Sequence, residues 1–359
     1  MRYSILMILI PLLVAGCISE IEFLDEENSF ISISGIITDN YQKNIITIVR
    51  VNGYTGEVEK LKATGAYYKD GAMAGPLAQF NSGELVFPID FRVEEGASYS
   101  VEIKVDNKVY RSHPQLIGPK LKMDSVSFEV NTRLDGTSST GTLANTIYAD
   151  FFAHITVPSD HRENPQFYRW QVDEIWEHRE VKNNGDPEDT VNICYPRTDV
   201  TEYPSVIVST ETLEPGSAKV FINSREIGRT FLHKHFFNAY LHTINEPLYR
   251  FYDKSQQLID DNGSLYDVTP AAIDGNLFNA DDESDRVLGV IEFAQVDTLR
   301  LGIYGYETKV STITDYCQAD DPCREFVFQG GFPPPPCPCY DCDKVFGAQT
   351  LIKPDYWDE

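Results

Sequence analysis

Strict alternation of apolar and polar residues constrains the fold of this chain more than any other feature. Residues 98–106, SYSVEIKVD, place an apolar side chain at every second position. A period of two predicts a β-strand with one buried face and one face in water. Residues 31–37 show a similar alternation, and residues 45–51 are β-branched and apolar. Asp106-Asn107-Lys108 has turn composition and leads into Val109-Tyr110, so we expect a hairpin there.

The same signal continues through the rest of the chain, together with one helix. The further strand candidates are 125–130, 147–157, 168–176, 287–293 and 299–304. The helix is expected to begin with Asn245 as its cap and Pro247 in its first turn. Its apolar residues fall on one stripe, and Asn262-Gly263 is expected to end it. The apolar faces of these strands and of the helix are expected to pack in the hydrophobic core.

Breaks in the pattern divide the chain into segments. Gly118-Pro119 interrupts the strands, and 359 residues suffice for about two domains. We therefore predict a mainly β protein, with an N-terminal Ig-like β-sandwich followed by a larger β-rich domain with one amphipathic helix. The expected segments are a signal peptide at 1–17, an acidic tether at 18–29, the sandwich at 30–118, the second domain at 119–316 and a Pro/Cys-rich, disulfide-stapled tail at 317–359.

Residues 1–17 have the composition of an export signal. Arg2 is followed by an apolar run, Ile5 to Val14, then by small residues and Cys17, which is the order of a secretory signal peptide. The run is too short to span roughly 30 Å of hydrocarbon as a helix. Val14-Ala15-Gly16-Cys17 has the pattern of a bacterial lipobox, so we expect lipidation of Cys17. An ordinary signal peptide that happens to end in cysteine is the alternative.

The net charge of −25 restricts the possible partners. Nucleic acids bind positively charged surfaces, so DNA and RNA are not expected as partners, and anionic lipid would repel the body. We therefore expect the lipid anchor to hold the protein at a membrane. Acidic residues just after the lipidated cysteine also occur in lipoproteins destined for the cell surface in Bacteroidota, so we expect the outward-facing side. An ordinary flexible linker, which would also be acidic here, is the alternative.

Six cysteines remain besides Cys17, and an exported chain meets an oxidising compartment. Disulfides are therefore expected, and six cysteines allow fifteen pairings, so the connectivity stays open. Zinc held by the Cys339-x-x-Cys342 pair together with Cys317 and Cys323 is the alternative. The disulfide candidates are Cys194, Cys317, Cys323, Cys337, Cys339 and Cys342.

Two other clusters contain side chains of metal-binding types. His233 and His235 would share one face of a strand, with His242 nearby, but no neighbouring carboxylate or cysteine completes a zinc pattern. We expect exposed strand histidines. The acidic run 281–285 has enough oxygens for calcium but lacks EF-hand spacing, so a solvated turn is favoured.

Motifs of enzymes and nucleotide-binding proteins are missing from the sequence. It contains no GxSxG, no P-loop and no GxGxxG after a predicted strand. We predict no metal, no catalytic residue and no cofactor apart from the lipid on Cys17.

Several segments together resemble a known family. The resemblance rests on C-I-S-E-I-E-F (17–23), I-S-I-S-G-I-I-T-D (31–39), N-E-P-L-Y-R-F-Y (245–252), G-S-L-Y-D-V-T-P-A-A-I-D-G-N-L (263–277), V-L-G-V-I-E-F (287–293), C-Y-D-C (339–342) and K-P-D-Y-W (353–357). In this order they resemble the Bacteroidota outer-membrane lipoprotein family called domain of unknown function 4249. Members of this family usually keep Pro-Pro-Pro where this chain has residues 267–270. The resemblance brings no catalytic residues, but it implies a setting beside TonB-dependent outer-membrane transporters.

These observations predict a non-enzymatic, lipid-anchored outer-membrane protein that faces the cell exterior. We expect it to dock on a TonB-dependent transporter barrel and to assist substrate capture or capping, which needs an apolar or aromatic patch on the body. A structural subunit of another outer-membrane complex, for protein assembly or secretion, is the alternative. A surface hydrolase is the third candidate, and two facing carboxylates of raised pKa would support it.

Overall fold

The computed structural model describes residues 29–40, 44–53, 55–136, 143–179, 193–201, 205–261, 273–282, 284–310, 342 and 348–358. Strands dominate these residues, and one long α-helix, α2 (Glu246–Asp261), accompanies them. The short 3-10 helices are η2 (Thr210–Thr212), η3 (Arg229–Phe231), η4 (Gly305–Thr308) and η5 (Ala348–Leu351). The prediction of a mainly β fold with one amphipathic helix is confirmed.

The strands fall into two groups along the chain. The first group is β1 (Ser29–Thr38), β2 (Ile45–Asn52), β3 (Val58–Lys60), β4 (Thr64–Lys69), β5 (Ala72–Asn81), β6 (Glu84–Val86), β7 (Ser98–Val105), β8 (Lys108–Ser112) and β9 (Gln115–Leu116). The second group is β10 (Ser125–Gly136), β11 (Leu143–Val157), β12 (Phe167–Trp176), β13 (His178–Arg179), β14 (Ile193–Cys194), β15 (Arg197–Asp199), β16 (Ile207–Ser209), β17 (Gly216–Glu226), β18 (Lys234–Ile244), β19 (Leu277–Asn279), β20 (Val287–Leu288) and β21 (Ile291–Tyr304).

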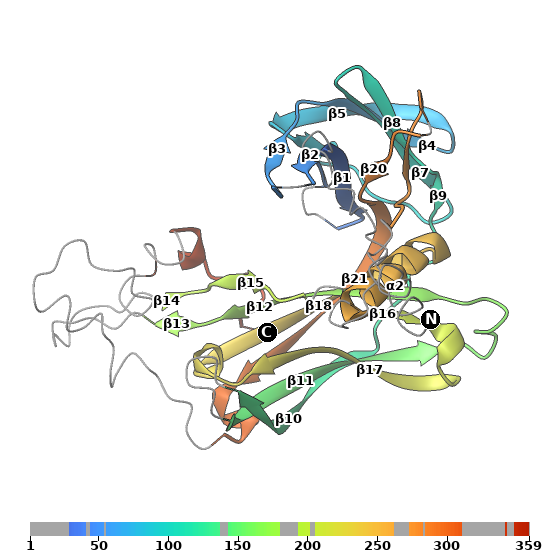
Figure 1. Cartoon of the computed structure of the whole chain (residues 1–359). Coiled ribbons are helices and arrows are strands. Elements are labelled where there is room, and N and C mark those ends of the chain that lie inside the picture. Colours follow the sequence, from blue (N-terminus) through green and yellow to red (C-terminus); the bar gives the residue numbers. More distant parts are fainter. Residues whose placement is uncertain are drawn as a thin grey trace, which may run out of the picture.

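β1 joins the two groups into one sheet. It pairs antiparallel with β2 along one edge, and parallel with β20 and β21 along the other. The resulting sheet has sixteen strands, with the order β15-β12-β18-β21-β1-β2-β6-β5-β4-β7-β8-β19, and β16, β20, β3 and β9 pair beside this path. β10-β11-β17 and β13-β14 form two smaller sheets. Figure 1 shows β1–β5, β7–β9 and β20 gathered in one body, β10–β18 in a second, and β21 running between them.

The N-terminal body is β-sandwich-like and encloses its own hydrophobic core. Residues 33–117 supply most of this first core, and residues 277–293 complete it. The predicted hairpin is confirmed as β7–β8, where Val105 lies opposite Lys108. Asp106 and Asn107 have φ of 48° and 68°, which a two-residue type I′ turn requires and which Asp and Asn tolerate. The expected domain boundaries stay predictions.

The predicted strand at 287–293 is interrupted. β20 ends at Leu288, and β21 begins at Ile291 and includes the predicted strand 299–304. Gly289 lies in the gap with φ +98°, and a Cβ there would come within 2.2 Å of the carbonyl oxygen of Ile33. The backbones of β1 and the β20–β21 link therefore approach closely at a point that only glycine fits.

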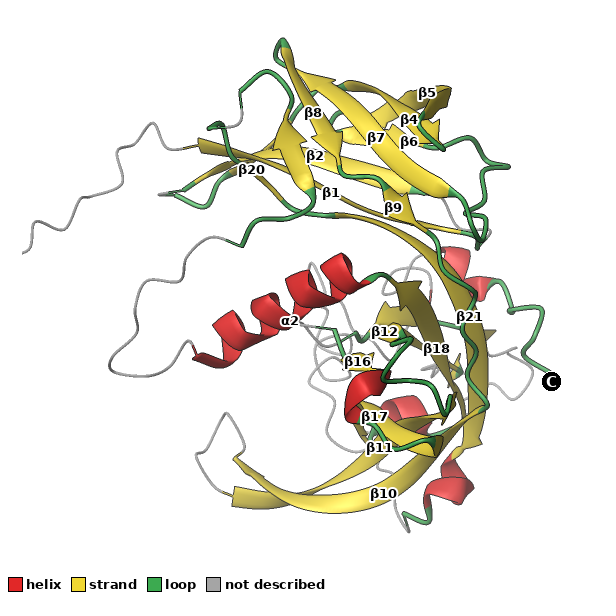
Figure 2. Cartoon of the chain, turned by 90° about the vertical axis from the view of Figure 1, so that its right-hand side faces the viewer, coloured by secondary structure: helices red, strands yellow, loops and turns green. Residues whose placement is uncertain are grey.

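The second body encloses a separate core between two sheets. One is β12-β18-β21, and the other is the three-stranded sheet β10-β11-β17, which curves beneath it (Figure 2). Phe151 of β11 and Phe237 of β18 stack across the interface with ring centroids 3.7 Å apart. Trp170 and Val172 of β12 are also buried in this second core.

Helix α2 lies where the two bodies meet (Figure 2). The Asn245 side-chain oxygen accepts the backbone N–H of Leu248 at 3.1 Å, so the predicted cap is confirmed. Leu248 is buried against Phe167, Ile244 and Ala294. The predicted end at Asn262-Gly263 lies outside the described residues.

Candidate functional site

One face of β12 in the second body is polar. Arg169, Gln171 and Asp173 share this face, because alternate residues of a strand point to the same side. The residues between them face the second core. On the neighbouring strand β18, Tyr240 lies opposite Gln171 and His242 lies opposite Arg169. The register therefore places five polar side chains on adjacent positions of one sheet face.

Arg169 and Glu292 of β21 form a buried ion pair at one end of this face. Arg169 Nε and Nη2 donate to the two carboxylate oxygens of Glu292 at 2.9 and 2.8 Å. His242 Nδ1 lies 2.7 Å from Glu292 Oε1, and the Tyr252 hydroxyl of α2 donates to Oε2 at 2.7 Å. Arg169 Nη1 donates to the Ser205 hydroxyl at 3.3 Å. Donors from three elements thus meet on one carboxylate.

The network determines the protonation of Glu292 and His242. Burial would raise the pKa of Glu292, but the Arg169 charge and the His242 ring outweigh burial and hold that pKa below its ordinary value. Burial, followed by the Arg169 charge, lowers the pKa of His242. An ionised carboxylate only accepts hydrogen bonds, so Nδ1 of His242 carries the ring proton. His242 is therefore neutral, with a lone pair on Nε2.

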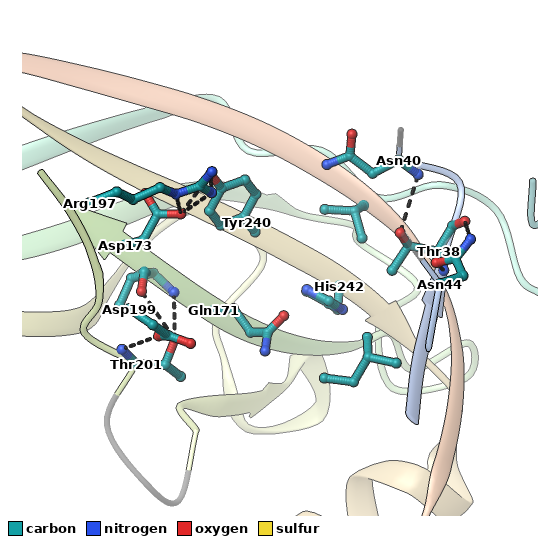
Figure 3. A pocket seen from close by; sticks show the side chains of 13 residues that line it. Thr38, Asn40, Asn44, Gln171, Asp173, Arg197, Asp199, Thr201, Tyr240 and His242 are labelled. Carbon is teal, nitrogen blue, oxygen red and sulfur yellow. Dashed lines mark hydrogen bonds and ion pairs between the residues drawn. The ribbon is translucent and has the colours of Figure 1, made fainter. Parts of the chain in front are cut away.

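A cavity of about 470 Å³ opens above the polar face (Figure 3). Its floor includes Gln171, Asp173, Tyr240 and His242. Its walls are built by the end of β1 and the following residues, and by β15 with Thr201. We call this cavity the polar pocket. It lies where the second body meets the first, so its shape depends on both.

Asp173 anchors one wall of the polar pocket. Its carboxylate accepts Arg197 Nε at 2.9 Å as well as Arg197 Nη2. The Tyr240 hydroxyl donates to it at 2.9 Å, and Asn238 Nδ2 donates to it at 2.6 Å. The charge of Arg197 is therefore matched within the wall, and the tyrosine and asparagine are held in place by the same carboxylate.

A second buried network lies on the opposite face of β12. Glu174 accepts Arg225 Nε and Nη2 at 3.0 and 2.7 Å, and its Oε2 lies 3.2 Å from His235 Nε2. Burial would raise the pKa of Glu174, but His235 and Arg225 outweigh burial and lower it. Burial lowers the pKa of His235. This network is remote from the polar pocket and links β12, β17 and β18.

The prediction of two exposed strand histidines, His233 and His235, is wrong. His235 and His242 are buried on β18, and each faces a carboxylate from another strand, Glu174 and Glu292 respectively. His233 directly precedes β18 and is partly buried. The carboxylates lie 61 and 50 residues away in sequence, so a search of neighbouring residues cannot find them.

The acidic run 281–285 fastens a turn to β8. Asp281 Oδ2 accepts the backbone N–H of Val109 at 3.1 Å, and Asp285 Oδ2 accepts Lys108 Nζ at 2.9 Å. Asp282 is exposed and caps the turn by accepting the Ser284 N–H at 2.9 Å. The expected solvated turn is present at Asp282, whereas Asp285 is partly buried. Glu283 lies outside the described residues.

Cys194 of β14 and Cys342 form a disulfide, with Cα atoms 5.8 Å apart. The other candidates and the lipidation residue lie outside the described residues: Cys317, Cys323, Cys337, Cys339 and Cys17. In the described part of the chain, one group of three metal-ligating side chains lies within reach of a single ion, and it consists of His178 and the two bridged cysteines. With their sulfurs joined, these cysteines are not thiolate ligands.

The C-terminal segment packs on the sheet beyond the polar pocket. The Trp357 ring contacts Phe236 and Tyr195 with centroid distances of 5.1 and 4.7 Å. Lys234 Nζ donates to the Trp357 carbonyl oxygen, and Arg300 lies over the Tyr356 ring at 4.3 Å. The backbone N–H of Tyr195 also donates to Thr350 at 2.7 Å. These contacts and the disulfide fasten the segment to the second body.

Apart from His242, the residues that build the polar pocket were not singled out from the sequence. One signal was present, because Arg169, Asp173 and Glu292 are charged residues that directly adjoin large apolar residues within predicted strands. A charge in such a strand indicates a buried ion pair. Which residue pairs with each charge depends on the order of the strands in the sheet, and the sequence alone does not give that order.

Comparison with protein families identifies the chain. The family model described as "Domain of unknown function (DUF4249)" matches residues 19–300. The chain belongs to the DUF4249 family. The match includes β12, β18 and most of β21, so the polar pocket of this DUF4249 protein lies within the matched region. A comparison with curated proteins finds no match. Among the described residues, no helix is long and apolar enough to cross a membrane.

Proposed function

We propose that this DUF4249 protein is a lipid-anchored accessory subunit of the outer membrane, facing the cell exterior. In this role it docks on a TonB-dependent transporter barrel and assists substrate capture or capping. The observation that carries the proposal is the preformed polar pocket. Its floor is already held by the Arg169–Glu292 and Asp173–Arg197 pairs, so binding there costs little reorganisation. The export signal with Cys17 supports the anchor.

A second surface supports docking. A hollow of about 660 Å³ on the second body is lined by Ile193, Tyr304, Tyr306 and Trp357. Tyr304 and Tyr306 stack with ring centroids 5.5 Å apart and are 43% and 77% exposed. Charged residues surround them, namely Glu177, Arg179, Lys353 and Asp358. An aromatic centre with a charged rim is the composition of a protein interface. We assign the barrel contact to this tyrosine hollow.

The pKa shifts of three carboxyl groups are opposite to the shift that a general acid needs. Glu174, Glu292 and Asp150 are carboxyl groups whose pKa values are lowered, because in each case nearby donors outweigh burial. An acid-catalysed hydrolase needs the reverse, a carboxyl group that keeps its proton near neutral pH. The hydrolase candidate therefore receives no support from these groups.

Affinity purification from native membranes tests the proposal. The full chain, captured with an antibody to its first body, is expected to bring down a TonB-dependent barrel. The double variant Tyr304→Ala/Tyr306→Ala should lose most of that barrel, whereas Phe80→Ala, an exposed aromatic of the other body, should keep it. Recovery of the protein alone counts against the proposal. Recovery of an assembly or secretion barrel instead supports the alternative of a structural subunit in such a complex.

A further inference from the structure

We propose that the polar pocket binds an uncharged cyclic polyol, about the size of a monosaccharide, through a hydroxyl group held between Gln171 and His242. The inference names the ligand class for the capture role proposed above, and for its biological setting it rests on that role. The binding chemistry itself follows from the hydrogen bonds, the charge pairing and the apolar surface in the described part of the chain.

His242 presents one unused acceptor to the polar pocket. The residue is 2% exposed, and its contacts with Glu292 and Arg169 involve only Nδ1. Nε2 has no partner among the described residues, and the side chain lines the cavity. A buried polar atom that lacks a partner loses the hydrogen bonds that water would give it. Because Nδ1 carries the ring proton, Nε2 is an acceptor, and the group that binds there must be a donor.

Gln171 lies within reach of the same point. It is two residues from Arg169 on β12, and Arg169 is the residue opposite His242 on the neighbouring strand β18. Diagonal neighbours of this kind are about 7–8 Å apart, so one small group can bridge two long side chains. Figure 3 shows the side chains of Gln171 and His242 next to each other. The Gln171 amide makes no hydrogen bond with another described residue, and it can donate. One hydroxyl group can therefore donate to His242 and accept from Gln171.

The charges around this point are already paired, which favours an uncharged ligand. Arg169 is matched by Glu292, and Arg197 is matched by Asp173. An anion would compete with these carboxylates for the guanidinium groups, and a cation would compete with the guanidinium groups for the carboxylates. Asp199 does not alter this balance, because it is an exposed residue of β15 beside Asp173 and water solvates its charge. The part of the pocket next to β18 therefore selects for a neutral donor.

The surface beside His242 suits the carbon ring of a polyol. Val296 of β21 lies opposite His242, and Ile36 lies on β1, the next strand of the sheet. Both line the cavity, so the C–H groups of a ring can cover them while its hydroxyl groups meet polar residues.

A second polar contact for such a ring is available at Thr38, which also lines the cavity. The Thr38 hydroxyl accepts the Asn40 backbone N–H at 3.2 Å, and its own proton has no acceptor among the described residues. The cavity of about 470 Å³ lies within the range of about 300–1,000 Å³ that is usual for small-molecule sites. The pocket can therefore hold a whole ring and contact more than one of its hydroxyl groups.

Calorimetry on the purified, unlipidated mature chain tests the ligand class. The first probes are methyl α-D-glucopyranoside and its per-O-methylated derivative, which share a ring and differ in hydrogen-bond donors. We expect the glucoside to bind about tenfold more tightly, because an ether cannot donate to His242. The methyl glycosides of glucuronate and glucosamine carry a charge on the same ring, and both should bind about tenfold more weakly than the glucoside. Added salt should leave the glucoside affinity unchanged, since no ion pair forms.

Two further probes separate the sources of such a ring. Tighter binding of maltose than of the glucoside assigns the ring to the end of a glycan. Tighter binding of myo-inositol assigns it to a free cyclic polyol, and weaker binding of both assigns it to a single sugar ring. Each of these results supports the ligand class.

Substitutions localise the binding. Gln171→Met keeps the length of the side chain without its amide and should weaken glucoside binding about tenfold, equivalent to about 1.4 kcal/mol. Gln79→Met makes the same chemical change at an exposed residue of β5 and should leave binding unchanged. In the wild type, the ¹⁵N resonance of His242 Nε2 should shift on addition of the glucoside and stay in place with the per-O-methylated derivative. A fold defect does not imitate that difference.

Several results would overturn the inference. They are equal binding of the glucoside and its ether, tighter binding of either charged glycoside, or full affinity in Gln171→Met. Absence of binding by every probe at millimolar concentration would do the same, since water alone would then fill the site. None of these outcomes affects recovery of a barrel from membranes. A protein that brings down a barrel but ignores polyols retains the proposed function and loses this ligand class, and the opposite pair of results does the reverse.

Discussion

Arg169 and Glu292 are 123 residues apart in sequence, yet two hydrogen bonds of 2.9 and 2.8 Å join their side chains. The exposed fractions of these side chains are 2% and 0%. The pair links β12 to β21, which is also the strand that pairs with β1 of the first body. One buried carboxylate therefore connects the floor of the polar pocket to the strand that joins the bodies.

Replacing Glu292 with Gln should destabilise the protein strongly. The substitution leaves the Arg169 guanidinium buried without its counter-ion, and such losses cost about 3–5 kcal/mol. Glu246→Gln removes an exposed partner of Arg250 within α2 and should cost less than about 1 kcal/mol. Urea unfolding followed by circular dichroism measures both changes. Similar losses of unfolding free energy in the two variants would show that the buried pair stabilises the fold no more than the exposed pair does.

Stability should fall as the pH decreases from about 8 to about 5.5. The pKa values of His235 and His242 are lowered in the folded protein, whereas the unfolded chain titrates near the ordinary value of about 6.5. Below that value the unfolded state therefore binds more protons than the folded state, and the free energy of unfolding decreases. Glu174 and Glu292 also have lowered pKa values, so they add a second loss at lower pH, below about 4.3.

The difference between the free energies of unfolding at about pH 8 and about pH 5.5 measures how much the buried histidines contribute to the pH dependence. His242→Gln should reduce the difference between them, since glutamine does not titrate. His113→Gln changes an exposed histidine of the first body and should leave the difference as in the wild type. An unchanged pH dependence in His242→Gln would exclude this histidine as the source.

Removing the Cys194–Cys342 disulfide should release the C-terminal segment. The bridge joins residues 148 apart, and loss of such a link costs about 2–5 kcal/mol. In Cys194→Ser/Cys342→Ser, limited proteolysis should cleave residues 348–358 from the body faster than in the wild type. Variants serve better here than a reductant, which would act on every cysteine. Non-reducing peptide mapping of the wild type should recover the two cysteines in one linked peptide pair, and free thiols at both positions would contradict the bridge.

Cys17→Ser should abolish lipidation and membrane attachment. A labelled fatty acid fed to cells should appear on the wild type and be absent from the variant, which should move to the soluble fraction. Cys194→Ser serves as the matched control, because it removes a cysteine of the mature body and should keep the label. A Cys17→Ser protein that stays with the membrane would disprove the anchor.

Local patterns in the sequence predicted the elements that depend on nearby residues. Alternation located β7 and β12, and the Asp106-Asn107 turn located the β7–β8 hairpin. Asn245 located the start of α2. Each depends on residues a few positions apart, where side-chain direction and turn geometry follow from backbone chemistry. Gly289 was missed because the close approach of Ile33 comes from a strand more than 250 residues away.

The sequence by itself determined a mainly β body with one capped helix and an acidic charge, because these depend on local periodicity and composition. The tertiary structure decided which strands are neighbours. Strand order alone brings Arg169, His242 and Glu292 onto one buried network and places Gln171 beside Asp199. A buried charge needs a partner that water no longer supplies, and the identity of that partner is a property of the folded sheet.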